Sequence, residues 1–270
     1  MRAGGLSGIA ACAGAQPDPG SPALRACGRD DKEGRRFRSL ENRMTLEHDV
    51  AELRRELAET RHELGVLQDV KAVRELQFKY GYYMDKCLFP AIVDLFSEDA
   101  VLYFLGGVYR GKAGARRLYG GATGLNGPVD GLLFEHLIVQ DIVDISPDRS
   151  RAWGRFRTFM QGGVHETHPN PPPNIPSQFW EGGVYENEYV REDGIWKFAV
   201  FNYRVVWQAD YETGWAHSRT EPLMVSTQTQ TFPENPRGPD EIASAPAPRW
   251  PRQGIHPFHY PHPVTGETIG

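Results

Sequence analysis

The sequence has few cysteines and no long apolar run. Its 270 residues include three cysteines, Cys12, Cys27 and Cys87, which form an odd set without a CxxC pair. This pattern argues against a disulfide framework and against a zinc site made by cysteine. No apolar run approaches the roughly 20 residues that a membrane helix needs. We therefore expect a protein of the cytoplasm that has no membrane partner.

The sequence also lacks an excess of positive charge and the common cofactor motifs. It carries 30 Lys and Arg against 35 Asp and Glu, a net charge of −5, with no long basic stretch. A nucleic-acid partner is therefore not expected. The absence of GxGxxG, P-loop and GxSxG patterns argues against a nucleotide cofactor and against a serine-hydrolase nucleophile. With 40% hydrophobic and 11% aromatic residues, the chain can still bury a large core.

Residues 1–43 differ from the rest of the chain. They are rich in Gly, Ala, Pro and Arg and show no apolar period. One interpretation is a secretory signal cleaved near Cys12, although the stretch before it is too rich in glycine for a good apolar segment. The other interpretation is a disordered extension, or a start assigned too early, with Met44 as the working initiator. We favour the extension.

Two consecutive helices are predicted from residue 44 onward. In residues 44–65, apolar side chains recur at spacings of three, four and seven, which indicates an amphipathic helix that Thr45 could cap. This leading helix could serve as a docking arm. Gly65 is expected to interrupt or bend it. A second helix follows, and the side chains that share its apolar face are Val66, Val70, Val73, Gln77, Tyr80 and Met84.

Residues 66–210 are predicted to form one domain. Its further elements are a short helix at 91–96, a hairpin at 100–105 and 108–110, a helix at 112–119, and long strands at 132–145, 151–162, 179–191 and 195–207. Helices first and antiparallel strands after them predict an α+β fold, with the helices packed on one face of a strongly curved sheet. Such a sheet closes partly into a cone, whose mouth is a natural pocket.

Residues 211–270 form a proline-rich tail. It holds ten prolines and no strong apolar period. We expect it to wrap the domain or a neighbouring subunit and to depend on that contact for its order. Its histidines His256, His259 and His262 lie among Pro, Phe and Tyr, a pattern that we interpret as an aromatic latch rather than a metal site.

The densest group of chemistry-bearing side chains lies at the end of the second predicted helix. Asp85 follows Tyr82 by three residues and Tyr80 by five, and residues three apart share a helix face. A carboxylate beside phenols could orient a histidine or accept a proton. The alternative is a solvated aspartate paired with Lys86, with the tyrosines at the edge of the core.

His136 interrupts an otherwise apolar strand. Phe134, His136 and Ile138 point to the same side of that strand, so His136 enters the cone if its two neighbours do. A buried neutral imidazole needs a partner for its N–H, and Asp85 is the available carboxylate. We therefore predict a catalytic pair of Asp85 and His136, with Tyr80 or Tyr82 as the acid.

Four further side chains are predicted to contact a substrate. Tyr103 could donate a hydrogen bond into the cone or simply fill it. Arg204 could anchor an anionic or phenolate group near the mouth. Phe134 and Trp207 would supply apolar lining. Neither a metal ion nor another cofactor is predicted at this site.

The layout resembles the SnoaL-like branch of the nuclear transport factor 2-like superfamily, whose members adopt a cone-shaped α+β barrel. The spacing of Tyr80 and Asp85 is similar to that of the catalytic pair of bile acid 7α-dehydratase. The strand around His136 is similar to the histidine strand of scytalone dehydratase, and the hairpin at 184–198 to that of hexachlorocyclohexane dehydrochlorinase. The resemblance covers residues 45–210. It implies a cofactor-free protein and a homo-oligomer, either a trimer or a dimer.

Together, the residues and the resemblance predict a cofactor-independent lyase. His136, held by Asp85, would take a proton from a small hydrophobic substrate, a hydroxylated aromatic or polycyclic molecule, and water would leave. The same groups could instead break a carbon–carbon bond and release an aldehyde such as formaldehyde, because both reactions need a base and a stabilised oxyanion. The alternatives are an isomerase, a polyketide cyclase or a non-catalytic ligand-binding module.

Overall fold

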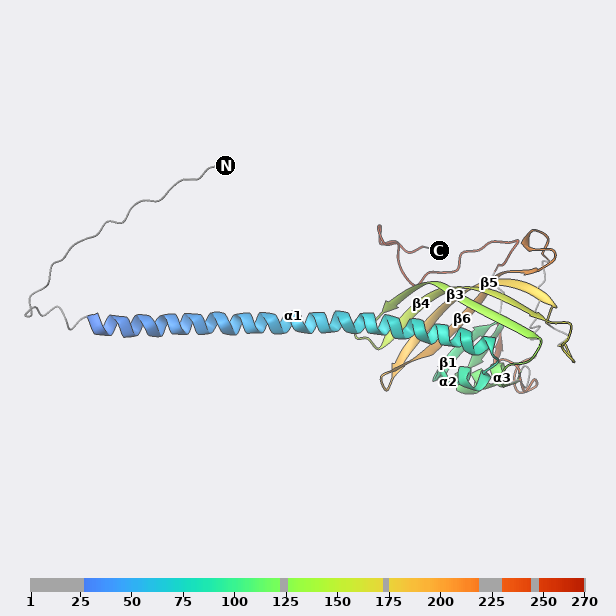
Figure 1. Ribbon diagram of the computed structural model, residues 1–270, viewed down its shortest axis with the longest axis horizontal. Helices are drawn as coiled ribbons and strands as arrows, with labels where there is room; N and C mark the ends of the chain where they lie inside the picture. Colours follow the sequence, from blue (N-terminus) through green and yellow to red (C-terminus); the bar gives the residue numbers. More distant parts are fainter. Residues whose placement is uncertain (1–26, 122–125, 172–174, 219–229, 244–247, 270) are drawn as a thin grey trace, which may run out of the picture. The chain divides into compact units, whose positions relative to one another are not determined.

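The computed structural model describes residues 27–121, 126–171, 175–218, 230–243 and 248–269. The chain divides into two compact units, residues 1–61 and 62–270. The described part of the first unit is helical and belongs to helix α1, Cys27–Asp85 (Figure 1). Residues 34–40 and 42–61 of this helix are all exposed.

Helix α1 begins earlier than the sequence pattern predicts. We expected a helix from Thr45 and an extension without regular structure before it, but residues 27–43 are helical as well. The reason is local propensity, because residues 27–43 include five arginines and two glutamates, which are good helix formers, and the chain has no proline between Pro22 and Pro90. We predicted no regular structure for residues 27–43 because they show no apolar period. A helix that is exposed on all sides does not need such a period. Residues 1–26 lie outside the described residues.

The prediction that Gly65 interrupts this helix is wrong. Gly65 is helical and buried, and a Cβ at this position would overlap the guanidinium of Arg149. Glycine inside a helix costs only about 1 kcal/mol relative to alanine. Here it makes room for Arg149, whose Nε donates to Oδ2 of Asp69 at 2.6 Å. Gly65 is therefore a packing glycine rather than a helix end.

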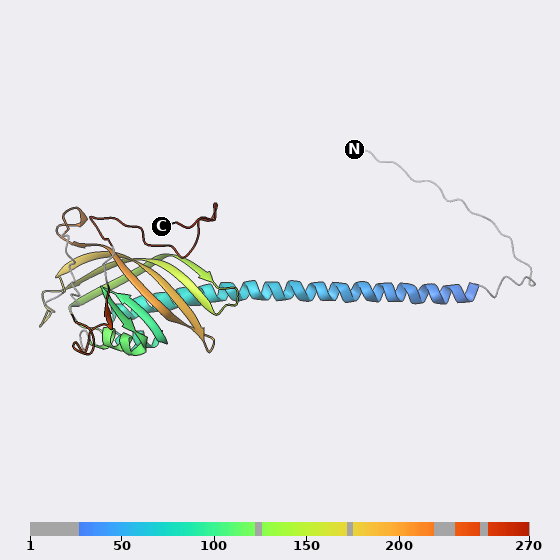
Figure 2. The ribbon, with the colours of Figure 1, turned by 180° about the vertical axis from the view of Figure 1, so that it is seen from behind.

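The second unit is built on a seven-stranded sheet with the strand order β3-β4-β5-β6-β1-β2-β7 (Figures 1 and 2). Its strands are β1 Phe96–Phe104, β2 Gly107–Arg110, β3 Leu132–Ile145, β4 Arg151–Val164, β5 Gln178–Glu192, β6 Ile195–Asp210 and β7 Glu241–Ile242. All neighbouring strands are antiparallel except β1 and β6, which are parallel. The short β7 was not predicted, and it pairs the tail with β2.

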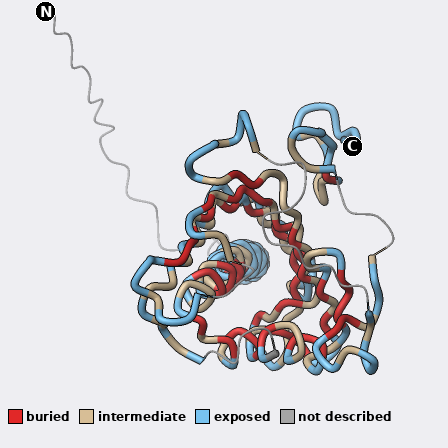
Figure 3. The backbone as a smooth tube through the Cα atoms, turned by 90° about the vertical axis from the view of Figure 1, so that its right-hand side faces the viewer, coloured by how far each residue is buried: buried red, intermediate tan, exposed pale blue. Residues whose placement is uncertain are grey.

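Two further helices complete the α+β fold that was predicted. They are α2, Phe89–Asp94, and α3, Gly111–Gly121, and a 3-10 turn follows β6 at Trp215–His217. The curved sheet surrounds residues 62–85 of α1, which Figure 3 shows end-on with the buried backbone around it. We call the sheet face that packs on α1 the inner face, and the opposite face the outer face.

The core between α1 and the inner face is mostly aromatic. The ring of Tyr80 lies 4.9 Å from the ring of Phe201 and 6.0 Å from those of Tyr185 and Phe198. Aromatic pairs in such edge-on and tilted arrangements contribute about 0.5–1.5 kcal/mol beyond the burial of their surface. This cluster fixes the helix against β5 and β6.

The described parts of the tail pack on the outer face and on β2. Arg155 lies over the ring of Phe258 at 4.1 Å and donates to the carbonyl oxygen of Pro257. His259 contacts the carboxylate of Glu186. These contacts join the histidine-rich segment to β4 and β5, and its role as an aromatic latch stays a prediction. At the other end of the sheet, the backbone N–H of Arg110 donates to Asp240 at 2.7 Å.

Asp69 ties α1 to the sheet, and its removal should destabilise the domain. It is 3% exposed, and it accepts from Arg149 at 2.6 Å and from Trp196 Nε1 at 3.1 Å. Although burial acts to raise its pKa, these hydrogen bonds and the charge of Arg191 hold the pKa below its ordinary value of 3.8.

We predict that Asp69→Asn lowers the free energy of unfolding by about 2 kcal/mol at neutral pH, measured by urea denaturation. Because the folded pKa is depressed, the difference from the wild type should shrink as the pH falls below about 4. Asp94→Asn, which removes an exposed carboxylate 3.8 Å from Lys112, is the control and should cost less than about 1 kcal/mol. Equal stability of the two variants would contradict the anchoring role.

Candidate functional site

Asp85 and His136 meet at the point where α1 crosses β3. Oδ1 of Asp85 lies 2.7 Å from Nδ1 of His136 and accepts the backbone N–H of His136 at 2.8 Å. Both side chains are 9% exposed. Asp85 is one turn beyond Gly81, where a Cβ would lie only 3.0 Å from Ile138 and 3.3 Å from the carbonyl oxygen of His136. The glycine thus lets the helix approach the strand closely enough for the two side chains to meet.

His136 belongs to a row of four side chains that runs across the inner face. In the strand register His136 pairs with Met160, Met160 with Glu181, and Glu181 with Gln208. Directly paired residues point to the same face of a sheet, so β3, β4, β5 and β6 each contribute one side chain to this row. Met160, Glu181 and Gln208 are all buried.

Glu181 is the second carboxyl group of this row. It is 3% exposed and accepts hydrogen bonds from the Tyr203 hydroxyl and, at 2.5 Å, from Nε2 of Gln208. Burial raises the pKa of Glu181 above its ordinary value of 4.5, against the opposing effects of these two hydrogen bonds and of the nearby His136 imidazole. A carboxyl group in this environment holds its proton to higher pH than an exposed glutamate does.

A hydroxyl group lies beside the same row. Thr158 pairs with Ile138 on one side and with Gly183 on the other, so it shares the inner face with His136. It is 1% exposed, and its Oγ1 has no hydrogen-bond partner among the described residues. An unsatisfied buried hydroxyl is costly, which makes Thr158 a candidate for contact with a polar group of a bound molecule.

The two tyrosines that were predicted as acids lie elsewhere. Tyr80 is 1% exposed inside the aromatic core, and its hydroxyl lies 3.2 Å from that of Tyr119. Burial raises the pKa of Tyr80 well above its ordinary range. Tyr82 is 73% exposed, so it lies on the surface of the helix. The structure does not show either phenol in contact with His136.

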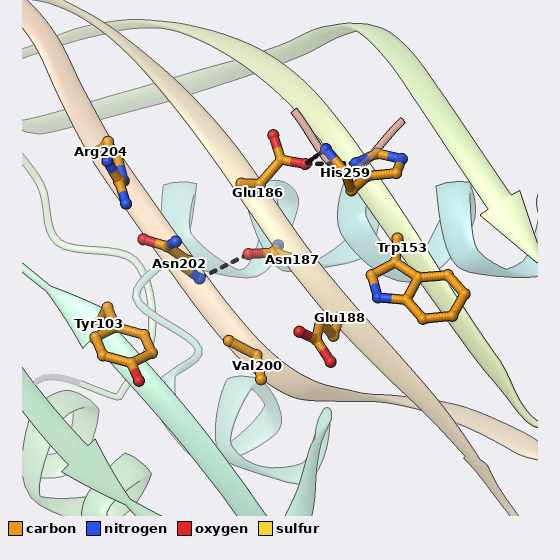
Figure 4. A pocket seen from close by; sticks show the side chains of 9 residues that line it. All are labelled: Tyr103, Trp153, Glu186, Asn187, Glu188, Val200, Asn202, Arg204 and His259. Atoms are coloured by element: carbon orange, nitrogen blue, oxygen red, sulfur yellow. Dashed lines mark hydrogen bonds and ion pairs between the residues drawn. The ribbon is translucent and has the colours of Figure 1, made fainter. Parts of the chain in front are cut away.

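Two of the predicted substrate contacts lie on the outer face. Tyr103 and Arg204 line a hollow of about 400 Å³ together with Glu186, Asn202 and His259 (Figure 4). Arg204 lies 3.2 Å from Nδ1 of His256 in the tail. In the strand register, Arg204 pairs with Val184, whose neighbours Gly183 and Tyr185 face inward. The sheet therefore separates Tyr103 and Arg204 from the Asp85–His136 pair.

Trp207 also faces outward, because β6 contains a bulge. Val205 pairs with Gly183 and Trp207 with Gly182, which leaves Val206 unpaired between them. This extra residue moves Trp207 to the outer face and Gln208 to the inner face. Trp207 lines a second hollow, of about 330 Å³, with Val206, Trp215, Trp250 and Gln253. Of the four predicted substrate contacts, only Phe134 shares the face of His136, and their ring centres are 6.4 Å apart.

The described residues contain no group of three or more His, Cys, Asp or Glu side chains arranged to hold a metal ion. Among those same residues, no helix is both long enough and apolar enough to cross a membrane.

A family model described as a SnoaL-like domain matches residues 65–202. This match covers just over half of the chain and includes both Asp85 and His136. The chain belongs to the SnoaL-like domain family. The predicted resemblance and the α+β cone fold are thereby confirmed. No curated protein matches the chain.

Solved structures similar to this SnoaL-like protein include several from Novosphingobium. A scytalone dehydratase-like protein of N. aromaticivorans is 22% identical over 54% of this chain and 89% of its own, with a TM-score of 0.43. A type-3 hexachlorocyclohexane dehydrochlorinase of N. barchaimii is 22% identical over 55% of this chain and 93% of its own, with a TM-score of 0.44. At these identities the likeness concerns the fold and not the reaction.

Sequence reasoning missed Glu181 and Thr158. Glu181 lies in the predicted strand 179–191 between Trp180 and two glycines. It is the one carboxyl group among the alternate residues of that strand that share a face with Phe179, Tyr185 and Tyr189, and a polar group on an apolar strand face is the same signal that singled out His136. That signal was available for Glu181. Thr158 carries no such signal, because an isolated threonine is ordinary in a strand.

The raised pKa of Glu181 leads to a test of this site in the SnoaL-like domain. When the pKa of a group is higher in the folded state than in the unfolded state, the group stabilises the protein at low pH. This contribution is lost as the pH rises from the unfolded pKa through the folded one. We therefore predict that Glu181→Gln gains thermal stability relative to the wild type as the pH is raised from about 4.5, the ordinary value.

The measurement is the midpoint of thermal unfolding across pH 4 to 9. Glu188→Gln changes the opposite face of the same strand, where Glu188 lines the outer hollow, and serves as the control. If the difference between Glu181→Gln and the wild type is independent of pH, Glu181 does not titrate as described.

Proposed function

We propose that this protein is a cofactor-independent lyase whose base is His136, oriented by Asp85. The observation that carries the proposal is the 2.7 Å contact between Asp85 Oδ1 and His136 Nδ1 at a position where both side chains are 9% exposed. The family match supports a lyase-like scaffold, and the substrate and the reaction are part of the proposal.

Asp85 decides which nitrogen of His136 can act as the base. A carboxylate accepts the N–H of Nδ1, so the neutral imidazole keeps its lone pair on Nε2. The backbone N–H of His136 binds the same oxygen, which fixes the carboxylate in place. This arrangement orients the imidazole and stabilises the imidazolium ion that forms when Nε2 takes a proton.

Glu181 is a better candidate for the acid than either tyrosine. It shares the inner-face row with His136, and its pKa is raised by burial, so its neutral form can donate a proton. Tyr80 instead has its hydroxyl beside that of Tyr119 in the aromatic core, and Tyr82 is 73% exposed. We therefore assign proton donation to Glu181.

The proposed reaction is the elimination of water from a β-hydroxy compound. Nε2 of His136 takes the proton from the carbon beside an electron-withdrawing group, and this electron pair forms the new double bond. The carbon–oxygen bond then breaks, and Glu181 protonates the departing oxygen. A positioned base and a positioned acid each contribute about 10²–10⁴-fold. Solvent returns the proton from His136 to Glu181.

A hydroxylated aromatic or polycyclic molecule suits this face best. Phe134, Met160 and the neighbouring core offer apolar and polarizable contacts, and the unsatisfied hydroxyl of Thr158 can bind a substrate hydroxyl. The same base could instead deprotonate a terminal hydroxyl group. The adjacent carbon–carbon bond then breaks, an aldehyde such as formaldehyde leaves, and the electron pair passes to the stabilised carbon.

We predict that His136→Ala and Asp85→Asn each lower turnover by about 10²–10⁴-fold while the protein stays folded. The full chain is incubated with a panel of β-hydroxy aromatic compounds, and mass spectrometry follows the loss of water or of an aldehyde. His62→Ala and Asp94→Asn, which change exposed residues, are the matched controls and should keep normal rates.

The outcomes separate the candidates. A product of unchanged mass would indicate an isomerase or a cyclase that uses the same pair. Binding of compounds without any product would indicate a ligand-binding module. Near-normal rates in either His136→Ala or Asp85→Asn would refute the assignment of the base.

A further inference from the structure

Helix α1 carries an exposed apolar seam that follows a heptad repeat. Its members alternate at spacings of four and three over 22 residues: Leu46, Val50, Leu53, Leu57, Thr60, Leu64 and Leu67. A spacing that averages 3.5 residues is the repeat of a left-handed coiled coil. The apolar members are between 38% and 67% exposed. We call these seven residues the seam.

Within the second unit, the last two seam residues lie on the side of the helix away from its contacts with the sheet. Gly65 and Asp69 face the sheet domain, where they meet Arg149, whereas Leu64 and Leu67 are exposed. The next two heptad positions are Lys71 and Arg74, so the apolar pattern ends there. The second unit contains two seam residues, Leu64 and Leu67, and leaves both of them exposed.

We propose that the seam binds the same segment of a second copy of this chain, in a parallel, in-register, two-stranded coiled coil. The proposal is independent of the lyase function. The second copy is chosen because of the charges that flank the seam. In two identical helices these charges are complementary when the helices run parallel and in register.

An acidic residue precedes each a position of the seam, and an arginine follows the two central d positions, Leu53 and Thr60. Asp49 and Glu56 are g residues, and Arg54 and Arg61 are e residues when Val50 and Leu57 are taken as a. In a parallel pair each g residue lies beside the e residue five places later in the partner helix. Asp49 would then meet Arg54 of the second copy, and Glu56 would meet Arg61.

An antiparallel pair would bring like charges together. In that arrangement g residues face g residues and e residues face e residues, so Asp49, Glu56 and Glu63 would lie against one another. Like charges held across an interface are unfavourable. Among the seam residues, Val50 at an a position with Leu46 and Leu53 at d positions matches the pattern of two-stranded coils, whereas the other two a positions, Leu57 and Leu64, are leucines.

Disulfide trapping in the full chain tests both the partner and its direction. Leu46→Cys is placed in a Cys12→Ser, Cys27→Ser background, and the buried Cys87 is left in place. Leu46 lies at one end of the seam, so two copies of it meet only if the helices are parallel. The matched control is His48→Cys, which is exposed on the side of the helix away from the seam.

Under mild oxidation we expect most of the Leu46→Cys protein to run as a covalent dimer and almost none of the His48→Cys protein to do so. Sedimentation equilibrium of the untrapped chain should give the mass of two copies. Equal trapping of the two variants would overturn the proposal. A mass of one copy would also overturn it, and a mass of three copies would refute the two-stranded form.

Charge exchange provides a second test that does not depend on cysteine. Glu56→Arg places like charges against Arg61 of the second copy, and Arg61→Glu places them against Glu56. Each single variant should weaken self-association by roughly tenfold. The double variant restores opposite charges at both contacts and should recover the affinity. If the double variant loses as much affinity for self-association as the two single variants lose together, the assigned pairing is wrong.

Discussion

The hydrogen bond between Asp85 and His136 depends on how closely α1 approaches β3. The helix lies against the inner face because Tyr80 packs among the rings of β5 and β6 and because Asp69 binds Arg149. Gly81 then allows the close approach to Ile138. A bulkier residue there would move the helix outward and separate the pair. The site is thus a consequence of packing between one helix and one strand.

The sheet divides the polar side chains of the domain into two sets with different surroundings. The inner set consists of Glu181 and Thr158, which are buried, and His136, whose side chain is 9% exposed, and burial raises the pKa of Glu181. The outer set, which includes Arg155, Glu186 and His259, is paired with the tail or with itself. The inner set therefore combines an imidazole, a carboxyl group of raised pKa and a hydroxyl group that has no partner among the described residues.

The fold and the central pair could be predicted from the sequence, but most of the surrounding site could not. Strand alternation placed His136 correctly, because β3 keeps an unbroken register next to Phe134. The same alternation failed for Trp207, since the unpaired Val206 reverses the faces beyond it. Tyr82 was predicted from its spacing to Asp85, yet spacing does not say which side of a helix a neighbouring strand will cover. Such features depend on long-range register and packing.

The protonation state of His136 tests the account most directly. Nitrogen-15 NMR of histidine-labelled full chain, assigned with a His136→Gln variant, reports which ring nitrogen carries the proton in the neutral form. The account predicts a proton on Nδ1 and a bare Nε2 in the wild type, with that preference lost in Asp85→Asn. A neutral imidazole protonated on Nε2, or one that Asp85→Asn leaves unchanged, would contradict it.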